Sequence, residues 1–115
     1  MSIKESNVTI NVKDLDKSIS FYASIGLTIK NRWGDYYAQL TAPGIVIGLH
    51  PANEINLTGN SGNVSIGFTV DDFENSKSSL QKLSIKTTDR EEAGGQFLHF
   101  NDPDGTALYL IKPKW

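Results

Sequence analysis

Two histidines, His50 and His99, are the residues most suited to chemistry in a chain that has no cysteine. Imidazole is a common ligand of first-row metals and a general base near neutral pH. The absence of cysteine excludes disulfides, thiolate metal ligands and cysteine nucleophiles. Two chemistries remain open: a metal site formed by both histidines with Glu5, or proton transfer in which His99 is the base and Tyr109 the proton donor. The alternative is that His50 is a strand-end residue and His99 a pocket wall.

These residues are positioned by a strand–helix–strand pattern. Residues 7–12, NVTINV, alternate apolar and polar side chains, which predicts a half-buried strand. Asp14 or Asp16 can cap a helix that follows, and Gly26 is placed to end it. Three more strands are predicted, at residues 27–33, 36–41 and 44–50.

The same plan then occurs a second time. The stretch INVKDLDKS, residues 10–18, recurs 58 residues later as FTVDDFENS, residues 68–76. The second copy predicts a helix from about 72 to 83 and strands at residues 63–70, 84–89, 96–101 and 105–112. The Asn- and Gly-rich segment 51–63 reads as the linker. We therefore predict an α+β fold of one domain, residues 1–115, with β-α-β-β-β modules at about 5–51 and 63–113.

Each module has one helix, which covers one face of its sheet and leaves the other face open. We expect the two sheets to form a curved mixed-sheet cup with the helices outside. Strand alternation then separates a core from a lining. The predicted core is Val8, Ile10, Val12, Ile45, Ile47, Leu49, Ile66, Phe68, Leu108 and Leu110. The predicted lining is Asn7, Thr9, Tyr37, Gln39, Gly48, His50, Ser65, Gly67, Phe97, His99, Ala107, Tyr109 and Ile111.

The lining combines aromatic rings with neutral hydrogen-bonding groups, a composition typical of small-molecule pockets. The predicted ligand-binding residues are Asn7, Thr9, Tyr37, Gly48, His50, Ser65, Phe97, His99 and Tyr109. In the alternative, the aromatic residues only fill the cup. Trp33 is either a rim aromatic or a dimer contact. The segment REEAGG, residues 90–95, is either a solvated loop or a lid hinged at Gly94 and Gly95.

Composition limits the partners. Eleven basic and thirteen acidic residues give a net charge of −2, without the basic clusters that nucleic-acid binding requires. The apolar runs are too short to span a bilayer, and the first residues, MSIKESN, do not form a signal peptide. We expect a cytoplasmic protein that binds neither nucleic acid nor membrane.

Two motifs carry a family resemblance: V-x-DL-x-x-S-x-x-FY-x-x-x-GL from Val12 to Leu27, and F-x-DPDG from Phe100 to Gly105. With the duplicated module, they resemble the vicinal oxygen chelate superfamily. It includes glyoxalase I, extradiol dioxygenases, fosfomycin-resistance enzymes and the metal-free bleomycin-resistance proteins. The DPDG motif itself has the composition of a structural turn, and we assign it no catalytic role.

The resemblance implies a divalent metal held by His, Glu or Gln from the first and last strands of each module. Here those positions fall on Asn7, Gly48, Ser65 and Tyr109, which are poor ligands. We predict no metal and no other cofactor, and a metal-free small-molecule-binding homodimer. Two alternatives stay open: a lyase, isomerase or dioxygenase with a relocated metal site, and a structural or regulatory dimer with a filled cup.

Overall fold

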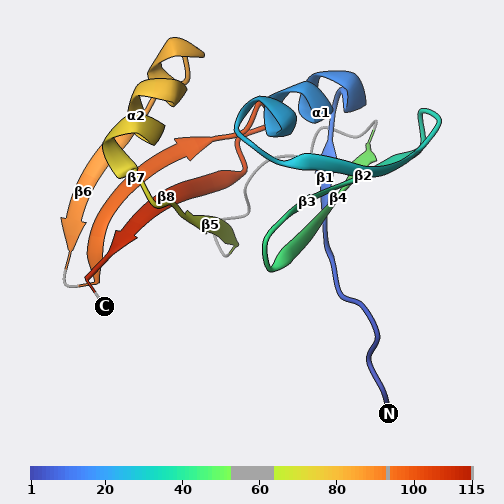
Figure 1. Cartoon of the computed structure of the whole chain (residues 1–115). Coiled ribbons are helices and arrows are strands. Elements are labelled where there is room, and N and C mark those ends of the chain that lie inside the picture. The colour runs from blue at the N-terminus through green and yellow to red at the C-terminus, as the bar shows by residue number, and fades with distance from the viewer. Residues whose placement is uncertain (53–63, 93, 115) are drawn as a thin grey trace. The chain divides into compact units, whose positions relative to one another are not determined.

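The computed structural model describes residues 1–52, 64–92 and 94–114 (Figure 1). The chain divides into two compact units, residues 1–59 and 60–115, called unit one and unit two below. The predicted linker, 51–63, lies almost wholly outside the described residues.

Each unit contains one helix and a four-stranded mixed sheet. Unit one consists of β1 (Val8–Val12), α1 (Leu15–Ser24), β2 (Thr28–Trp33), β3 (Tyr37–Ala42) and β4 (Ile45–Pro51), with strand order β1-β4-β3-β2. Unit two consists of β5 (Ser65–Thr69), α2 (Phe73–Lys82), β6 (Thr88–Glu92), β7 (Gly95–Asn101) and β8 (Ala107–Pro113), with strand order β5-β8-β7-β6. The predicted α+β class and tandem β-α-β-β-β modules are confirmed. Over the described residues, neither sheet closes into a barrel.

The two sheets repeat the same register. In each unit the first strand pairs with the last in parallel, and the other pairs are antiparallel. Thr9 lies opposite Gly48 in unit one, and Gly67 lies opposite Tyr109 at the corresponding place in unit two. The sequence repeat is therefore also a structural repeat.

Both helices begin at an aspartate cap. The Asp14 carboxylate accepts the Lys17 N–H at 3.1 Å, and the Asp72 carboxylate accepts the Asn75 N–H at 3.0 Å. Such caps satisfy backbone donors that have no partner within the helix. Gly26 has φ +113 where the chain leaves α1, a conformation that favours glycine. Within the described ranges, no helix is long and apolar enough to cross a bilayer.

One ion pair joins each helix to the edge strand of its sheet, with reversed polarity in the two units. In unit one, Asp16 of α1 lies 2.7 Å from Arg32 of β2; in unit two, Lys77 of α2 lies 2.6 Å from Asp89 of β6. The hydrogen bond from each cation to its partner carboxylate raises the pKa of Arg32 and of Lys77. Both pairs are partly exposed to solvent, so each contributes little to the stability of the fold.

The core lies on the face of each sheet that its helix covers. Its most buried side chains include Val12, Tyr22, Leu40, Ile47, Leu49, Leu98 and Leu108. Ile10, Ile45 and Phe68, predicted as core, are half-buried. The prediction for Val8 was wrong, because 40% of this residue is exposed. Val8 begins an edge strand, where only one neighbouring strand shields a side chain.

The segment after α2 differs from the prediction. The strand expected at residues 84–89 begins at Thr88, and β6 continues to Glu92, which pairs with Gly95 of β7. Arg90–Glu92 and Gly95 therefore belong to the strands of a β-hairpin, so the loop interpretation was wrong for these residues. The lid interpretation stays a prediction. Every β6 residue is exposed. Charged residues suit an exposed edge strand, so the acidic composition suggested a loop although it belongs to a strand.

Candidate functional site

The open face of unit one carries a hydrogen-bonded cluster around the hydroxyl of Tyr37. The Asn7 Nδ2 donates to Thr9 Oγ1 at 3.0 Å and to the Tyr37 hydroxyl at 3.4 Å. The Gln39 Nε2 donates to the same hydroxyl at 3.2 Å, and Thr9 Oγ1 lies 3.3 Å from it. The hydroxyl oxygen thus accepts from two amides and can donate its own proton to Thr9.

Gly48 makes room for this cluster. A Cβ built at Gly48 would collide with the Tyr37 hydroxyl and lie 2.8 Å from Thr9 Oγ1, inside ordinary contact distance. Gly48 is itself buried. The tyrosine therefore occupies the volume that any side chain at position 48 would take.

The open face of unit two is aromatic. The rings of Phe97 and His99 are stacked, with centroids 6.1 Å apart and planes 16° from parallel. The Tyr109 ring contacts both, with centroids 5.7 Å from Phe97 and 5.8 Å from His99. All three are half-buried, so the cluster is packed and yet reaches the surface. Such a group of ring faces is suited to bind a flat apolar ligand.

Gly67 does in unit two what Gly48 does in unit one. A Cβ built at Gly67 would collide with the ring of Tyr109, which lies across the strand from it. In both units, a tyrosine packs over a glycine near the middle of the open face. The sequence predicted the two glycines and two tyrosines on this face but not their pairing.

The structure thus forms two clusters from the predicted binding residues. Unit one brings together Asn7, Thr9, Tyr37 and Gly48, and unit two brings together Phe97, His99 and Tyr109. Two predicted residues stand outside these clusters: His50 is exposed on β4, and Ser65 is exposed at the start of β5.

The neighbours of His99 bear on its predicted role as a base. Its ring contacts are with Phe97 and Tyr109, and among the described residues no carboxylate bonds to it. An imidazole base in an enzyme is ordinarily oriented by a hydrogen bond on its other nitrogen. Among the described residues, no three His, Asp or Glu side chains lie close enough together to hold an ion. Glu5 and His50 belong to unit one and His99 to unit two, so the relocated metal site stays a prediction.

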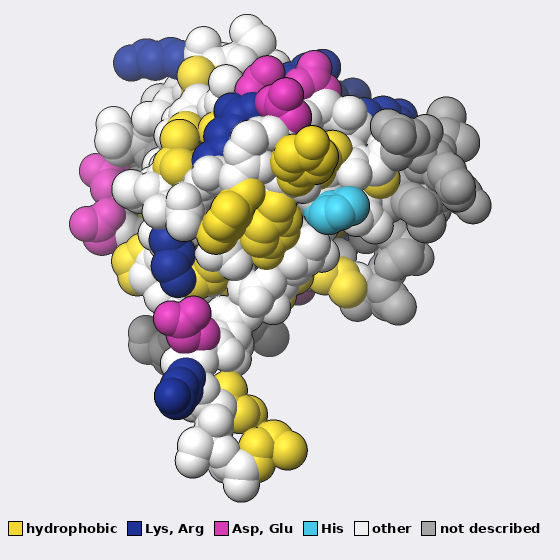
Figure 2. All heavy atoms as spheres, turned by 90° about the vertical axis from the view of Figure 1, so that its right-hand side faces the viewer, with side chains coloured by type: hydrophobic (Ala, Val, Ile, Leu, Met, Phe, Trp, Pro, Cys, Tyr) yellow, Lys and Arg dark blue, Asp and Glu magenta, His cyan; other side chains and the backbone are white. Residues whose placement is uncertain are grey.

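Trp33 lies at the end of β2, beside the hairpin turn to β3. Its ring centroid is 5.4 Å from that of Tyr37, and 46% of the residue is exposed. Tyr36, in the turn, is 80% exposed. Figure 2 shows hydrophobic side chains gathered on one side of the molecule, beside a histidine and below a group of charged side chains. The rim and dimer-contact interpretations of Trp33 both stay predictions.

The DPDG segment is a structural turn. The Asp102 carboxylate accepts the N–H groups of Asp104 at 2.9 Å and Thr106 at 2.8 Å, and the Asp102 carbonyl accepts the Gly105 N–H at 3.1 Å. Asp102 is 5% exposed, and Gly105 has φ +90. These bonds stabilise the turn between β7 and β8, in agreement with the turn prediction.

Comparison with known proteins supports the resemblance. The family model for the glyoxalase/bleomycin resistance protein/dioxygenase superfamily matches residues 6–110. The chain belongs to this superfamily. No match was found among curated proteins.

Solved members of the superfamily have the same fold over nearly the whole chain. A glyoxylase/bleomycin resistance protein/dioxygenase domain from Frankia sp. EAN1pec is 25% identical, with a TM-score of 0.75 over 99% of this chain and 100% of that one. The fosfomycin resistance protein FosX of Listeria monocytogenes, solved with Mn(II) and sulfate, is 19% identical, with a TM-score of 0.80 over 99% and 93%. A bleomycin-binding protein complexed with bleomycin is 18% identical, with a TM-score of 0.72 over 97% and 100%.

The residues at the superfamily's metal positions do not fit a metal in this chain. Gly48 offers no side chain, and the space above it is taken by the Tyr37 hydroxyl. Asn7 and Ser65 supply neutral oxygens, which are weak ligands compared with imidazole or carboxylate. Tyr109 packs its ring against Phe97 and His99 over Gly67. A Tyr–Gly pair therefore stands at the last-strand position of each module.

Two further residues on the face of unit two were missed from the sequence. Thr88 pairs with His99 and Arg90 pairs with Phe97, so both β6 side chains lie on the aromatic face. The prediction placed the strand four residues too early and treated Arg90 as part of a loop. Assigning alternate residues to alternate faces, starting from the hairpin at Gly95, would have placed both side chains on this face.

Proposed function

We propose that this chain is a metal-free, small-molecule-binding protein of the glyoxalase/bleomycin-resistance type, and that it acts as a cytoplasmic homodimer. The observation that carries the proposal is the Tyr–Gly pair at each last-strand metal position. The pair removes a ligand and fills its place, while the strands around it keep the superfamily's arrangement. The fold is retained and the residues needed for metal chemistry are not.

The side chains around these pairs support binding of a neutral or aromatic group. The polar cluster of unit one offers amide and hydroxyl groups, and the cluster of unit two offers ring faces. A bleomycin-binding protein of similar fold was solved with its ligand. That likeness supports binding as the class of function and leaves the ligand of this chain to be found by experiment.

The metal part of the proposal is tested by native mass spectrometry. The protein is purified without added metal and measured again after incubation with nickel, manganese, zinc and ferrous iron. We expect a dimer mass with no metal retained. One tightly held ion per chain would contradict the proposal and favour the enzyme alternative, with His50 and His99 as the first residues to replace.

The binding part is tested by a thermal-shift screen of small aromatic and heteroaromatic compounds. A ligand that binds only the folded state raises the melting temperature, and the stabilisation grows with the logarithm of its concentration above Kd. Tyr109→Ala, which removes one ring of the aromatic cluster, should abolish the shift, whereas Tyr36→Ala, which removes an exposed turn ring, should leave it intact. Equal shifts in both variants would show that the aromatic cluster is not the site.

One observation favours a different function for unit one. The Tyr37 hydroxyl is already bonded by neighbours on its own face, which is the behaviour of a filled surface. In a structural or regulatory dimer, the Tyr37→Ala variant would lose stability or dimerisation and bind no new compound. In the binding protein, the same variant keeps its dimer mass and changes its compound profile.

A further inference from the structure

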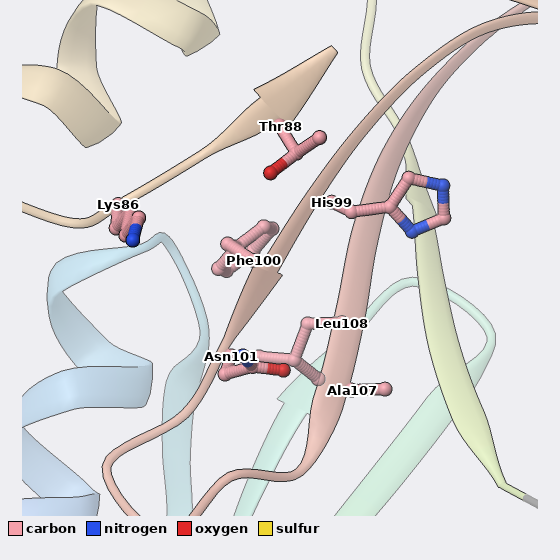
Figure 3. A pocket seen from close by; sticks show the side chains of 7 residues that line it. All are labelled: Lys86, Thr88, His99, Phe100, Asn101, Ala107 and Leu108. Carbon is pink, nitrogen blue, oxygen red and sulfur yellow. The ribbon is translucent and has the colours of Figure 1, made fainter. Parts of the chain in front are cut away.

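Unit two has a cavity where β6 begins beside β7. The ladder between these strands runs from Glu92 and Gly95 to Thr88 and His99, but β7 continues to Asn101, where it pairs only with Ala107 of β8. A cavity of about 290 Å³ lies at this fork, which we call the fork cavity. Figure 3 shows Lys86 and Thr88 at the start of β6, and Phe100 and Asn101 on β7.

Asn101 is paired with Ala107 of β8 and has no ladder partner on the side of β6. In an antiparallel strand, successive residues direct their N–H and C=O groups to opposite sides. The Asp102 N–H bonds to the Thr106 carbonyl, on the side of β8, so the Asn101 N–H faces the side of β6. Since β6 begins at Thr88, the described strands provide no bond for it there. The Asn101 N–H is thus directed to the side of the sheet edge on which the fork cavity lies.

The polar side chains that line the fork cavity belong to Lys86, Thr88, His99 and Asn101. Each can donate a hydrogen bond, and Lys86 carries a positive charge. Lys86 supplies an ammonium group, Thr88 a hydroxyl and Asn101 an amide, while Phe100 and Leu108 form apolar wall. The lining includes no aspartate or glutamate. Lys86 makes no ion pair with a described residue. A carboxylate matches this set, because it accepts several hydrogen bonds and neutralises the charge.

The fork cavity adjoins the aromatic cluster. Thr88, His99 and Tyr109 lie in one row across the sheet with their side chains on the same face. In Figure 3 the His99 ring points away from Phe100, which belongs to the opposite face. Arg90 lies beside Phe97 on the aromatic face, with His99, and adds a second cation. Glu92, two residues further along β6, lies further from the cavity.

We infer that the fork cavity binds the carboxylate of a planar aromatic ligand whose ring lies against His99. The inference rests on the proposed function and narrows its ligand to aromatic carboxylates. The ring contacts give apolar burial, and the carboxylate interacts with Lys86, Thr88 and the Asn101 N–H. The donors of the fork cavity thus determine the charge of the ligand, and the aromatic cluster determines its shape.

The test is a titration of the ¹⁵N-labelled protein with 2-naphthoate and with 2-naphthamide, which differ in charge but have the same ring. We expect naphthoate to bind about 10-fold more tightly, a ratio that corresponds to one charge-assisted hydrogen bond. Naphthoate should shift the amide signals of Thr88 and Asn101, and both compounds should shift His99. Lys86→Gln should remove the preference for naphthoate and leave the affinity for naphthamide unchanged.

Lys30→Gln is the matched control, because it removes the same charge from β2 of unit one. Equal affinity for the two compounds, or an equal loss in both lysine variants, would overturn the carboxylate subsite and leave the binding proposal standing. Acetate shifting the same amides as strongly as naphthoate would overturn the aromatic ligand class. If neither naphthalene compound perturbs any residue of the aromatic cluster, the inference fails, and a negative thermal-shift screen would then reject the binding proposal separately.

Discussion

The open faces of the two sheets share one backbone pattern but are held together by different interactions. In unit one, a single tyrosine hydroxyl joins Asn7, Thr9 and Gln39 through hydrogen bonds. In unit two, Tyr109 lies on the last strand, β8, at the position that Gly48 occupies in unit one, and its ring contacts two other rings. The repeated module thus preserves strand order and register, while the side chains of each face determine what that face can bind.

The largest effect is expected at the hairpins, where the two units differ most. Gly95 has φ +144, and a Cβ there would collide with the Lys112 carbonyl, whereas Gly34, in the hairpin of unit one, has φ +54 and only a side chain nearby. Gly95→Ala should lower the free energy of unfolding by about 3 kcal/mol, through backbone strain and overlap. Gly34→Asn should change it by less than about 0.5 kcal/mol, because asparagine tolerates this conformation. Urea unfolding measures both, and similar losses would show that the hairpins are equivalent.

The next effect concerns the glycines under the tyrosines. Gly48→Ala should cost about 2 kcal/mol, because the new methyl group displaces Tyr37 and breaks its hydrogen bonds. Gly67→Ala should cost less than about 1 kcal/mol, since Gly67 is exposed and Tyr109 can move outward with the loss of ring contacts alone. Urea unfolding of the two variants gives both free energies. A larger loss for Gly67→Ala than for Gly48→Ala would contradict the expectation that the face of unit one is the more tightly packed.

A smaller change isolates the hydroxyl groups. Tyr37→Phe should destabilise the protein by about 1 kcal/mol, because the hydrogen bonds to that hydroxyl are lost. Tyr109→Phe should have nearly no effect on stability, because its described contacts are through the ring. Thermal unfolding of the two variants side by side gives the comparison, and equal shifts would mean that the polar cluster contributes nothing beyond packing.

The smallest effect separates the two ion pairs by pH. The pKa of Lys77 is raised above its ordinary value of 10.5, so the stabilisation from its pair with Asp89 is complete below that value and is lost as the pH rises through the raised pKa. Arg32 keeps its charge in this range, so its pair with Asp16 persists. The stability difference between the wild type and Lys77→Gln should therefore decrease above pH 10.5, whereas the difference for Arg32→Gln should stay constant. If the stability differences of the two variants changed with pH in the same way, the raised pKa of Lys77 would not arise from its pair with Asp89.

The sequence predicted most of the fold because its signals are local and occur twice. The caps at Asp14 and Asp72, the turn glycines and the alternating strands each depend on a few neighbouring residues. The failures occurred at edges. Val8 follows the apolar pattern but is 40% exposed, and every residue of β6 is exposed, which allows it a loop-like composition.

The candidate site was predictable as a list of residues but not as contacts. Strand parity placed Tyr37 and Tyr109 on the open faces, but it carries no information on rotamers, which decide that each ring lies over a glycine. The fork cavity was not predictable, because it depends on the first residue of β6, Thr88, lying short of the last residue of β7, Asn101. Strand ends are the least certain features of a sequence-based prediction, and here one of them forms the pocket.

The parallel pairing of first and last strands also sets the order in which each unit can be completed. During synthesis, β1 leaves the ribosome before α1, β2 and β3, and its partner β4 follows only after them. The hairpin of β2 and β3 needs only neighbouring residues and can form earlier. A nascent chain stopped before β4 therefore exposes the edges of both β1 and β3, and the same holds for β5 and β7 until β8 is made. The last strand of each module joins the two parts, so truncations there should be far more harmful to folding than the same loss from the extended first residues.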